Sequence, residues 1–300
     1  MVKIAGLVTD INWFQFLRKE QDLQTVNFWN PSGMGFTKLK QGELVLFKLK
    51  SPVNKIAGGG VFTHFEKLPW KMAWDTFGRG NGAETANKFH VQLLSNRNNT
   101  NTESFVIGCT ILSNPFFLDD GAFLNEPKDW KPSIVRGKYY DTSEHIGMQL
   151  WHDAQYFLWQ DNLDEQERFG PPQLIHPRLG QGAFRSLIRA NYNNRCAVTK
   201  ERTLPVLEAA HIKPYSQGGS HELSNGILFR SDIHKLFDEG YVTVTPNYKF
   251  EVSRRLHEEY HNGKIYYDLC GNDIFIPSDK KQTPPDTNLL EWHNNNCYKG

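Results

Sequence analysis

The chain has 300 residues, of which 39% are hydrophobic and 22% charged, a composition typical of a globular protein rather than a disordered one. The four cysteines are scattered without a CxxC pair, a spacing that argues against a zinc ribbon and does not indicate a disulfide framework. No apolar run reaches 18 residues and the N-terminus has no signal-peptide pattern, so we expect a cytoplasmic protein that does not enter a membrane. The length predicts two domains.

The net charge of +1 does not by itself indicate a nucleic-acid partner, but the charge is unevenly placed. Residues 178–202 carry six basic residues against the single acid Glu201. A cationic strip of this kind suits contact with phosphates, although an ordinary solvated helix surface fits it equally well. We assign the DNA phosphate contacts to Arg185, Arg189 and Arg195.

The first 145 or so residues consist mainly of predicted strands and turns. Residues 42–50 alternate apolar and polar side chains and lead through a Pro-Val-Asn turn into 55–65, which indicates a hairpin. Further strands are expected at 89–94 and 104–112, and short helices at 11–19 and 69–77. We therefore expect an α+β fold whose N-terminal part is a small curved β-barrel with short helices.

Residues 144–169 change to helical spacing, and 170–182 are rich in Pro and Gly, as in a linker between domains. We place a first domain at 1–155, a linker at 156–177 and a second domain at 178–300. The second domain is expected to begin with a helix at 183–192 and a short strand at 195–199.

Residues 208–244 contain the pattern with the clearest chemistry. It predicts a strand ending at His211, a Gly-Gly loop, an Asn225-Gly226 turn into a strand at 227–229, and a helix capped by Ser231-Asp232 that carries His234. A neutral histidine can take a proton from an attacking water, and a side-chain amide can pin the loop that holds it. A divalent ion held by histidine or carboxylate ligands can stabilise the leaving oxygen of a phosphodiester.

His211, Asn225 and His234, at spacings of 14 and 9 residues, resemble the HNH (ββα-metal) nuclease motif. The stretch from Arg178 to residues 289–293 resembles the HNH subgroup found at the C-terminus of bacterial restriction endonucleases. This resemblance implies that His211 is the general base, that Asn225 orders the loop, and that His234 binds the metal.

One position departs from that pattern. Many HNH nucleases have Asp or His just before the general base as a second metal ligand, but here that residue is Ala210. Asp238 is our first choice for the missing ligand because it lies one helical turn after His234. Glu208 is the second choice, since a residue three positions before His211 on a strand points to the opposite face.

Oxygen-rich ligation favours Mg²⁺ or Mn²⁺, although imidazole also tolerates Ni²⁺ or Co²⁺. Among the other candidate ligands, His221 is expected to be an exposed loop residue. Cys196 is expected to pack in the core.

The first domain is aromatic-rich, and a pocket for a flipped base needs stacking faces together with hydrogen-bonding groups. Segments 28–33, 40–62, 107–118 and 134–141 resemble the EVE domain of the PUA-like superfamily. That resemblance implies a reader of a modified nucleobase, and we assign its pocket to Trp29, Ser32 and Trp74. The glycines at 58–60 are compatible with close approach of DNA, but a tight β-bend explains them better.

An EVE-like domain joined to an HNH domain resembles modification-dependent restriction endonucleases, which cut double-stranded DNA bearing 5-methylcytosine or 5-hydroxymethylcytosine. Two alternatives remain. The enzyme could recognise unmodified sequence or another modification such as phosphorothioate, or the chain could be a DNA reader with a degenerate nuclease fold, as Ala210 would allow. Double-strand cleavage would need either a homodimer or two successive nicks.

Overall fold

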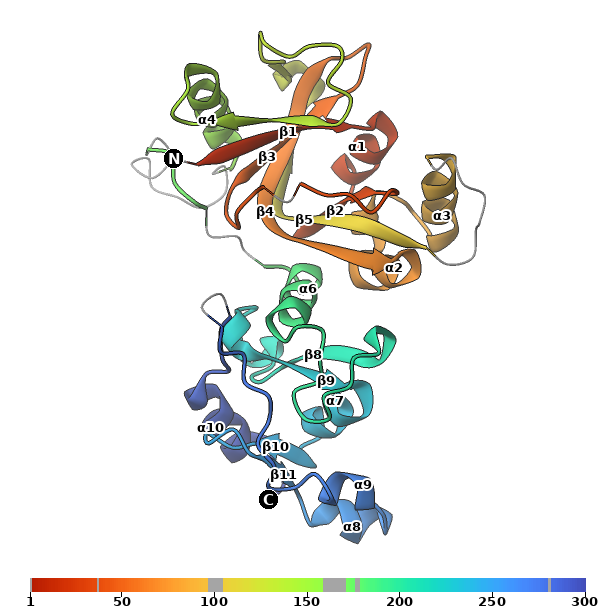
Figure 1. Ribbon diagram of the computed structural model, residues 1–300, viewed down its shortest axis with the longest axis vertical. Coiled ribbons are helices and arrows are strands. Elements are labelled where there is room, and N and C mark those ends of the chain that lie inside the picture. The colour runs from red at the N-terminus through yellow and green to blue at the C-terminus, as the bar shows by residue number, and fades with distance from the viewer. Residues whose placement is uncertain (1, 37, 97–104, 159–170, 176–178, 280–281) are drawn as a thin grey trace. The chain divides into compact units, whose positions relative to one another are not determined.

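The computed structural model describes residues 2–36, 38–96, 105–158, 171–175, 179–279 and 282–300. The chain forms two compact units, Met1–Ala183 and Phe184–Gly300 (Figure 1). Most of the segment expected to be a linker lies outside the described residues, so that assignment stays a prediction. None of the described helices combines the length and the apolar character needed to cross a lipid bilayer.

The first unit contains seven strands and several helices. In chain order they are β1 (Lys3–Thr9), α1 (Ile11–Arg18), β2 (Thr25–Asn30), β3 (Leu44–Leu49), β4 (Lys55–Pro69), α2 (Trp70–Phe77), a 3₁₀ helix (Gly78–Asn81), α3 (Ala86–Ser95), β5 (Val106–Phe117), a 3₁₀ helix (Asp120–Ala122), β6 (Leu124–Asn125), β7 (Gly137–Asp141) and α4 (His145–Leu158).

The strands form one sheet in the order β2-β5-β4-β3-β1-β7, with β6 paired to β4. Neighbouring strands are antiparallel except β1 and β3, which are parallel. Within the described residues no pairing joins the edge strands β2 and β7, so the sheet is open and the closed barrel is not observed. The side chains of Trp13 and Phe14 on α1 pack against one face of the sheet, so a helix, and not an opposing wall of strands, buries that face.

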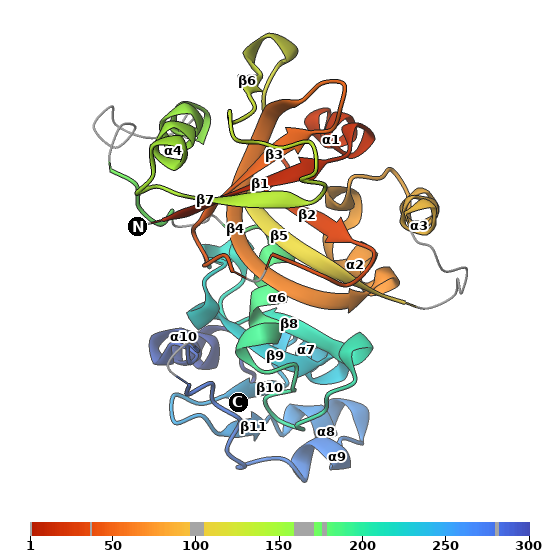
Figure 2. The same cartoon turned by 45° about the horizontal axis from the view of Figure 1, so that its top comes forward.

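The long strand β4 bends sharply across the sheet (Figure 2). Its register against β5 shifts between Gly59 and Val61 and again between Phe62 and His64. A Cβ atom on Gly59 would lie 2.4 Å from the carbonyl oxygen of Val45 on β3. The glycines at 58–60 therefore let neighbouring strands approach closely at the bend, which confirms the β-bend interpretation.

Both faces of the sheet are buried, as alternation along β3 shows. Val45 and Phe47 belong to a core with α1, whereas Leu44 and Leu46 belong to a second core with Leu150 and Trp151 of α4. Successive strand residues point to opposite faces, so β3 is buried on both sides and residues 44–47 form a continuous apolar run instead of the predicted alternation.

The hairpin at β3 and β4 and the helices α1 and α2 confirm their predictions, but two predicted strands were wrong. Residues 89–94 lie in helix α3, where Thr85 caps the N-terminus and Phe89 and Leu93 share the buried face. Apolar residues at alternate positions fit a strand over so short a window, and the same residues also contain an i, i+4 apolar pair that fits a helix. Residues 195–199 form a turn, which is closed by a hydrogen bond from the amide of Cys196 to the carbonyl of Glu201. The side chain of Cys196 is buried, as expected.

The second unit has two short antiparallel hairpins among helices. Its elements are α6 (Gln181–Asn191), which begins three residues before the unit boundary, 3₁₀ helices (Leu204–Val206, Tyr215–Gln217 and Leu223–Asn225), β8 (Leu207–His211), β9 (Gly226–Arg230), α7 (Ser231–Asp238), β10 (Val242–Val244), β11 (Phe250–Val252), α8 (Arg255–Tyr260), α9 (Lys264–Tyr267) and α10 (Thr287–Asn296).

The hairpin of β8 and β9 and the helix α7 give this unit a strand–loop–strand–helix frame. Ile227, Phe229, Ile233 and Phe237 are all buried in a single core of the unit. Helix α6 lies close against the hairpin because Gly226 has no side chain there: a Cβ atom would be 2.3 Å from Ile188.

Candidate active site

Three elements position the predicted catalytic residues. His211 is the last residue of β8, Asn225 ends the 3₁₀ turn before β9, and His234 lies in the middle of α7. His211 pairs with Gly226 across the hairpin, so Asn225 is held next to the strand that carries His211. The local fold thus brings together residues up to 23 positions apart.

Asn225 joins the two ends of the β8–β9 loop. Its Oδ1 accepts a hydrogen bond from the Lys213 amide at 2.9 Å, while its Nδ2 donates to the carbonyls of Lys213 and Ser220 at 3.0 and 2.8 Å. The side chain is 1% exposed, and a buried amide with its donors and acceptor satisfied rigidifies its surroundings. The loop that follows His211 is therefore anchored from inside.

The His211 ring is half-buried and stacks on Phe184, with ring centroids 4.0 Å apart and an angle of 11°. Burial lowers the pKa of His211 to about 4, and His221, His234 and Arg185 act in the same direction. The imidazole is consequently neutral at neutral pH and has a lone pair that can accept a proton.

His221 contacts His211 directly, a contact that the sequence pattern did not indicate. Its Nδ1 lies 2.9 Å from Nε2 of His211, and its ring stacks on Tyr215 at 4.8 Å. The ring is half-buried rather than exposed on a loop, and burial lowers its pKa. Its spacing from His211 matches no motif; the available clue was that the loop that Asn225 closes begins directly after His211 and contains His221.

His234 lies between two carboxylates. Its Nδ1 is 2.7 Å from Oε2 of Glu208, and its Nε2 is 3.3 Å from Oδ2 of Asp238. Glu208 does lie on the opposite face of β8 from His211, as strand alternation predicts, and this is the face that α7 covers. Ala210, on the same face as Glu208, is fully buried and supplies no ligand.

Desolvation raises the pKa of the Asp238 carboxyl, although more than half of its side chain is exposed. Glu208 and Glu239 add to this rise, while His234 opposes it. Neighbouring negative charges of this kind favour a bound cation. Among the described residues, however, no group of three or more His, Cys, Asp or Glu side chains has the geometry of a metal site.

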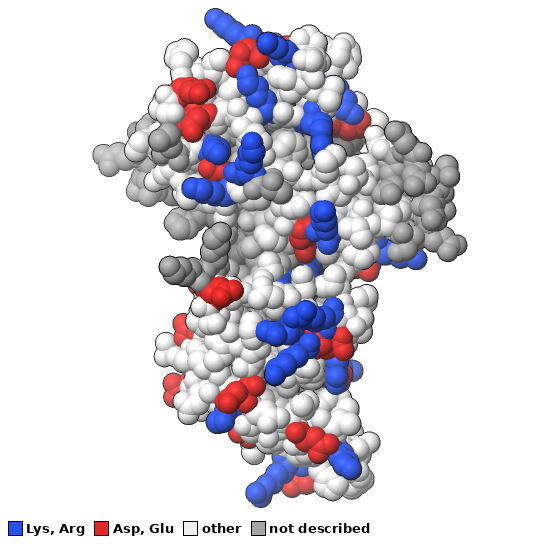
Figure 3. Space-filling view, in the orientation of Figure 1, with Lys and Arg blue, Asp and Glu red and all other residues white. Residues whose placement is uncertain are grey.

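The three predicted phosphate-contacting arginines lie in different surroundings. Arg185 is half-buried, and its charge reaches His211. Arg189 is only 4% exposed, so in this conformation it cannot reach a phosphate. The Arg195 guanidinium lies 3.9 Å from the centre of the Phe275 ring. Acidic and basic side chains are interspersed on the face drawn in Figure 3, which shows no continuous cationic surface.

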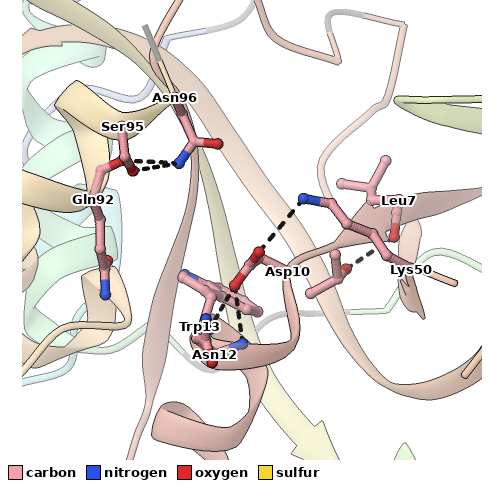
Figure 4. Close-up of polar contacts among 9 residues, drawn as sticks. Leu7, Asp10, Asn12, Trp13, Lys50, Gln92, Ser95 and Asn96 are labelled. Carbon is pink, nitrogen blue, oxygen red and sulfur yellow. Dashed lines mark hydrogen bonds and ion pairs between the residues drawn. The ribbon is translucent and has the colours of Figure 1, made fainter. Parts of the chain in front are cut away.

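A separate cavity of about 370 Å³ lies in the first unit, and Figure 4 shows the polar contacts of several of the residues that line it. Its lining combines aromatic, amide and charged side chains: Val8, Asp10, Asn12, Trp13, Phe28, Trp29, Asn30, Pro31, Phe36, Lys50, Gln92, Ser95, Asn96, Val135 and Arg136. Asp10 caps α1 by accepting from the amides of Asn12 and Trp13, and its other oxygen is 3.5 Å from Nζ of Lys50.

Of the predicted base-pocket residues, only Trp29 lines this cavity. Its Nε1 donates to the carbonyl of Asn81 at 2.8 Å, which fixes the indole. Ser32 is exposed and bonded to Asn30, and Trp74 packs against Phe89 outside the lining. Trp29 also contacts Phe89, so the two tryptophans are near each other without sharing the cavity.

Comparison with known proteins identifies residues 196–245 as an HNH endonuclease domain. The matched segment includes His211, Asn225 and His234, and the chain therefore carries a nuclease domain. No curated protein sequence matches the chain.

Among solved structures, a mutant of the ZmASCH protein from Zymomonas mobilis aligns over 49% of this chain and 95% of its own, with 10% identity and a TM-score of 0.34. A structure described as the modification-dependent TagI restriction endonuclease aligns over 98% of this chain and 81% of its own, with 11% identity and a TM-score of 0.31. At these scores neither likeness establishes a shared fold or activity.

Proposed function

We propose that this protein is a metal-dependent endonuclease that recognises modified cytosine in double-stranded DNA and hydrolyses a phosphodiester bond. The observation that carries the nuclease part is the placement of His211, Asn225 and His234 on one strand–loop–strand–helix frame within the HNH domain. The EVE-like resemblance of the first unit and its aromatic cavity support the modified-cytosine part.

In this proposal His211 takes the proton of the attacking water, and Asn225 keeps its loop in place. HNH nucleases generally use a divalent ion, which would stabilise negative charge on the phosphate and the leaving oxygen. Of the predicted phosphate contacts we retain Arg185 and Arg195, and we give Arg189 a structural role because it is buried.

His234 and Asp238 fit the requirement for two ligands of one ion. Ligand atoms about 2.1 Å from a shared ion, at angles of about 90–110°, lie roughly 3.0–3.4 Å apart. The observed distance between Nε2 and Oδ2 is 3.3 Å. With its Nδ1 proton donated to Glu208, His234 would present the Nε2 lone pair to the metal. In this assignment Glu208 orients His234 and is not itself a metal ligand.

The base-reading site is assigned to the cavity rather than to the residues first chosen. Its volume of about 370 Å³ is within the range of small-ligand pockets, about 300–1,000 Å³. Trp13, Phe28 and Trp29 offer stacking faces, and Asp10 and Asn12 offer groups for the edge of a flipped base.

The test is a cleavage assay on matched duplexes containing cytosine, 5-methylcytosine or 5-hydroxymethylcytosine, with Mg²⁺, with Mn²⁺ and with a chelator. We expect metal-dependent cutting of a modified duplex and little cutting of the unmodified one. His211→Ala should lower the rate by about 10² or more while leaving DNA binding intact. Equal cutting of all three duplexes would contradict the proposed dependence on modified cytosine. Cutting in the presence of the chelator would contradict the proposed dependence on a metal ion.

A further inference from the structure

The general base proposed here has one ring nitrogen already engaged. Nε2 of His211 faces Nδ1 of His221 at 2.9 Å, a normal hydrogen-bond distance. A neutral imidazole has one N–H and one lone pair, so the direction of this bond decides whether His211 can act as a base. If His211 donates from Nε2, its Nδ1 has the free lone pair; if it accepts, its only lone pair is occupied.

Both rings are held in place from outside the pair. His211 lies flat on Phe184, and His221 lies flat on Tyr215, with angles of 11° and 8° between the ring planes. The carbonyl of Ser220, next to His221, accepts a hydrogen bond from the buried Asn225. The contact between the two histidines therefore results from the way the loop is built.

We propose that His221 is a positioning residue for His211: it accepts the Nε2–H of His211 and thereby keeps the lone pair on Nδ1, where it can take the proton of water. This inference rests on the proposed function, because the direction of the hydrogen bond follows from the role of His211 as the base. Metal-binding histidines use second-sphere acceptors in the same way to fix a tautomer. His221 acts through His211 and makes no contact with the substrate in this assignment.

The direct test is the tautomer of His211 in the free protein. Long-range proton–nitrogen correlation spectra of protein labelled with ¹⁵N in histidine, recorded at pH 7.5, distinguish the two forms, and His211→Ala identifies the signals. We expect the Nε2–H form in the wild type and a mixture in His221→Ala. A wild-type Nδ1–H form, or a tautomer unchanged in His221→Ala, would overturn the proposal.

A cleavage measurement gives a second readout. His221→Ala should lose at least about 10-fold in rate, and less than the loss of about 10²–10⁴ expected on removing the base itself. His221→Asn should recover most of the rate, because its amide oxygen can take the place of Nδ1 as an acceptor. His257→Ala, at an exposed position on α8, is the matched control and should cut at the wild-type rate.

The two hypotheses fail in different ways. If the wild type cuts no DNA, the proposed function fails, while the tautomer still tests the role of His221. If the wild type cuts and His221→Ala cuts equally fast, the role of His221 fails and the nuclease assignment stands.

Discussion

His293 is a second histidine that burial keeps neutral, in the core of the nuclease unit and outside its active site. Its side chain is 2% exposed, its Nδ1 lies 2.8 Å from Oγ1 of Thr243, and its ring stacks on Phe237 at 3.7 Å. Burial lowers the pKa of His293 to about 4, with the Phe237 carbonyl opposing the shift. Protonation of this residue therefore opposes folding.

The pH dependence of stability follows from that shift. Between about pH 6.5 and pH 4 the unfolded chain binds a proton at His293 that the folded protein does not. The contribution of neutral His293 to the free energy of unfolding is thus complete above pH 6.5 and is lost as pH falls toward 4, by up to about 3 kcal/mol. Replacing His293→Phe should reduce this pH dependence in urea unfolding at pH 7.5 and 4.5. His211 titrates in both proteins, so an identical dependence in the two would contradict the assignment.

At the scale of elements, the bend of β4 depends on the absence of a side chain at Gly59. The substitution Gly59→Ala would place a Cβ atom 2.4 Å from the backbone of β3, which can move only if the strands separate. We expect a loss of about 1–3 kcal/mol in the free energy of unfolding. Gly121→Ala, where a Cβ atom meets nothing within 4 Å, should be nearly neutral in the same denaturation experiment.

The β8–β9 loop is the second element whose order depends on one residue. Asn225→Ala removes three hydrogen bonds and leaves the Lys213 amide without its partner, which should cost about 2–4 kcal/mol. Amide exchange in residues 212–221 should accelerate most, and cleavage should fall with it. Exchange that rises uniformly over the unit, or not at all, would argue against a local anchor; exposed Asn295→Ala is the control.

At the scale of the whole molecule, the chain joins an aromatic cavity in one unit to a nuclease frame in the other. The structure distinguishes two tryptophans that the sequence alone could not distinguish as base-pocket residues: Trp29 lines the cavity and Trp74 does not. Removing a stacking face costs about 1–3 kcal/mol, or roughly 5- to 150-fold in affinity.

Trp29→Ala should therefore weaken binding to modified DNA by such a factor and reduce the preference over unmodified DNA, as measured by competition binding. Trp74→Ala should leave the preference unchanged in protein shown by thermal unfolding to be folded. If Trp74→Ala reduced the preference and Trp29→Ala did not, the base-reading site would lie at Trp74 on α2 and not in the cavity.

The sequence by itself predicted the nuclease frame, because its residues lie within 24 positions of one another and a hairpin followed by a helix is specified by local turns and periodicity. It also predicted the β-bend at 58–60 and the helices α1 and α2. Over residues 89–94 it failed, since a six-residue pattern cannot separate periods of 2 and 3.6.

Only the tertiary structure decided which side chains meet. The contact of His221 with His211 depends on the path of a loop, and that of Glu208 with His234 depends on which face of β8 the helix α7 covers. The cavity draws its lining from residues between Val8 and Arg136, so no local pattern could include Trp29 and exclude Trp74. Local chemistry is encoded in short segments, whereas the partners that orient it are set by long-range packing.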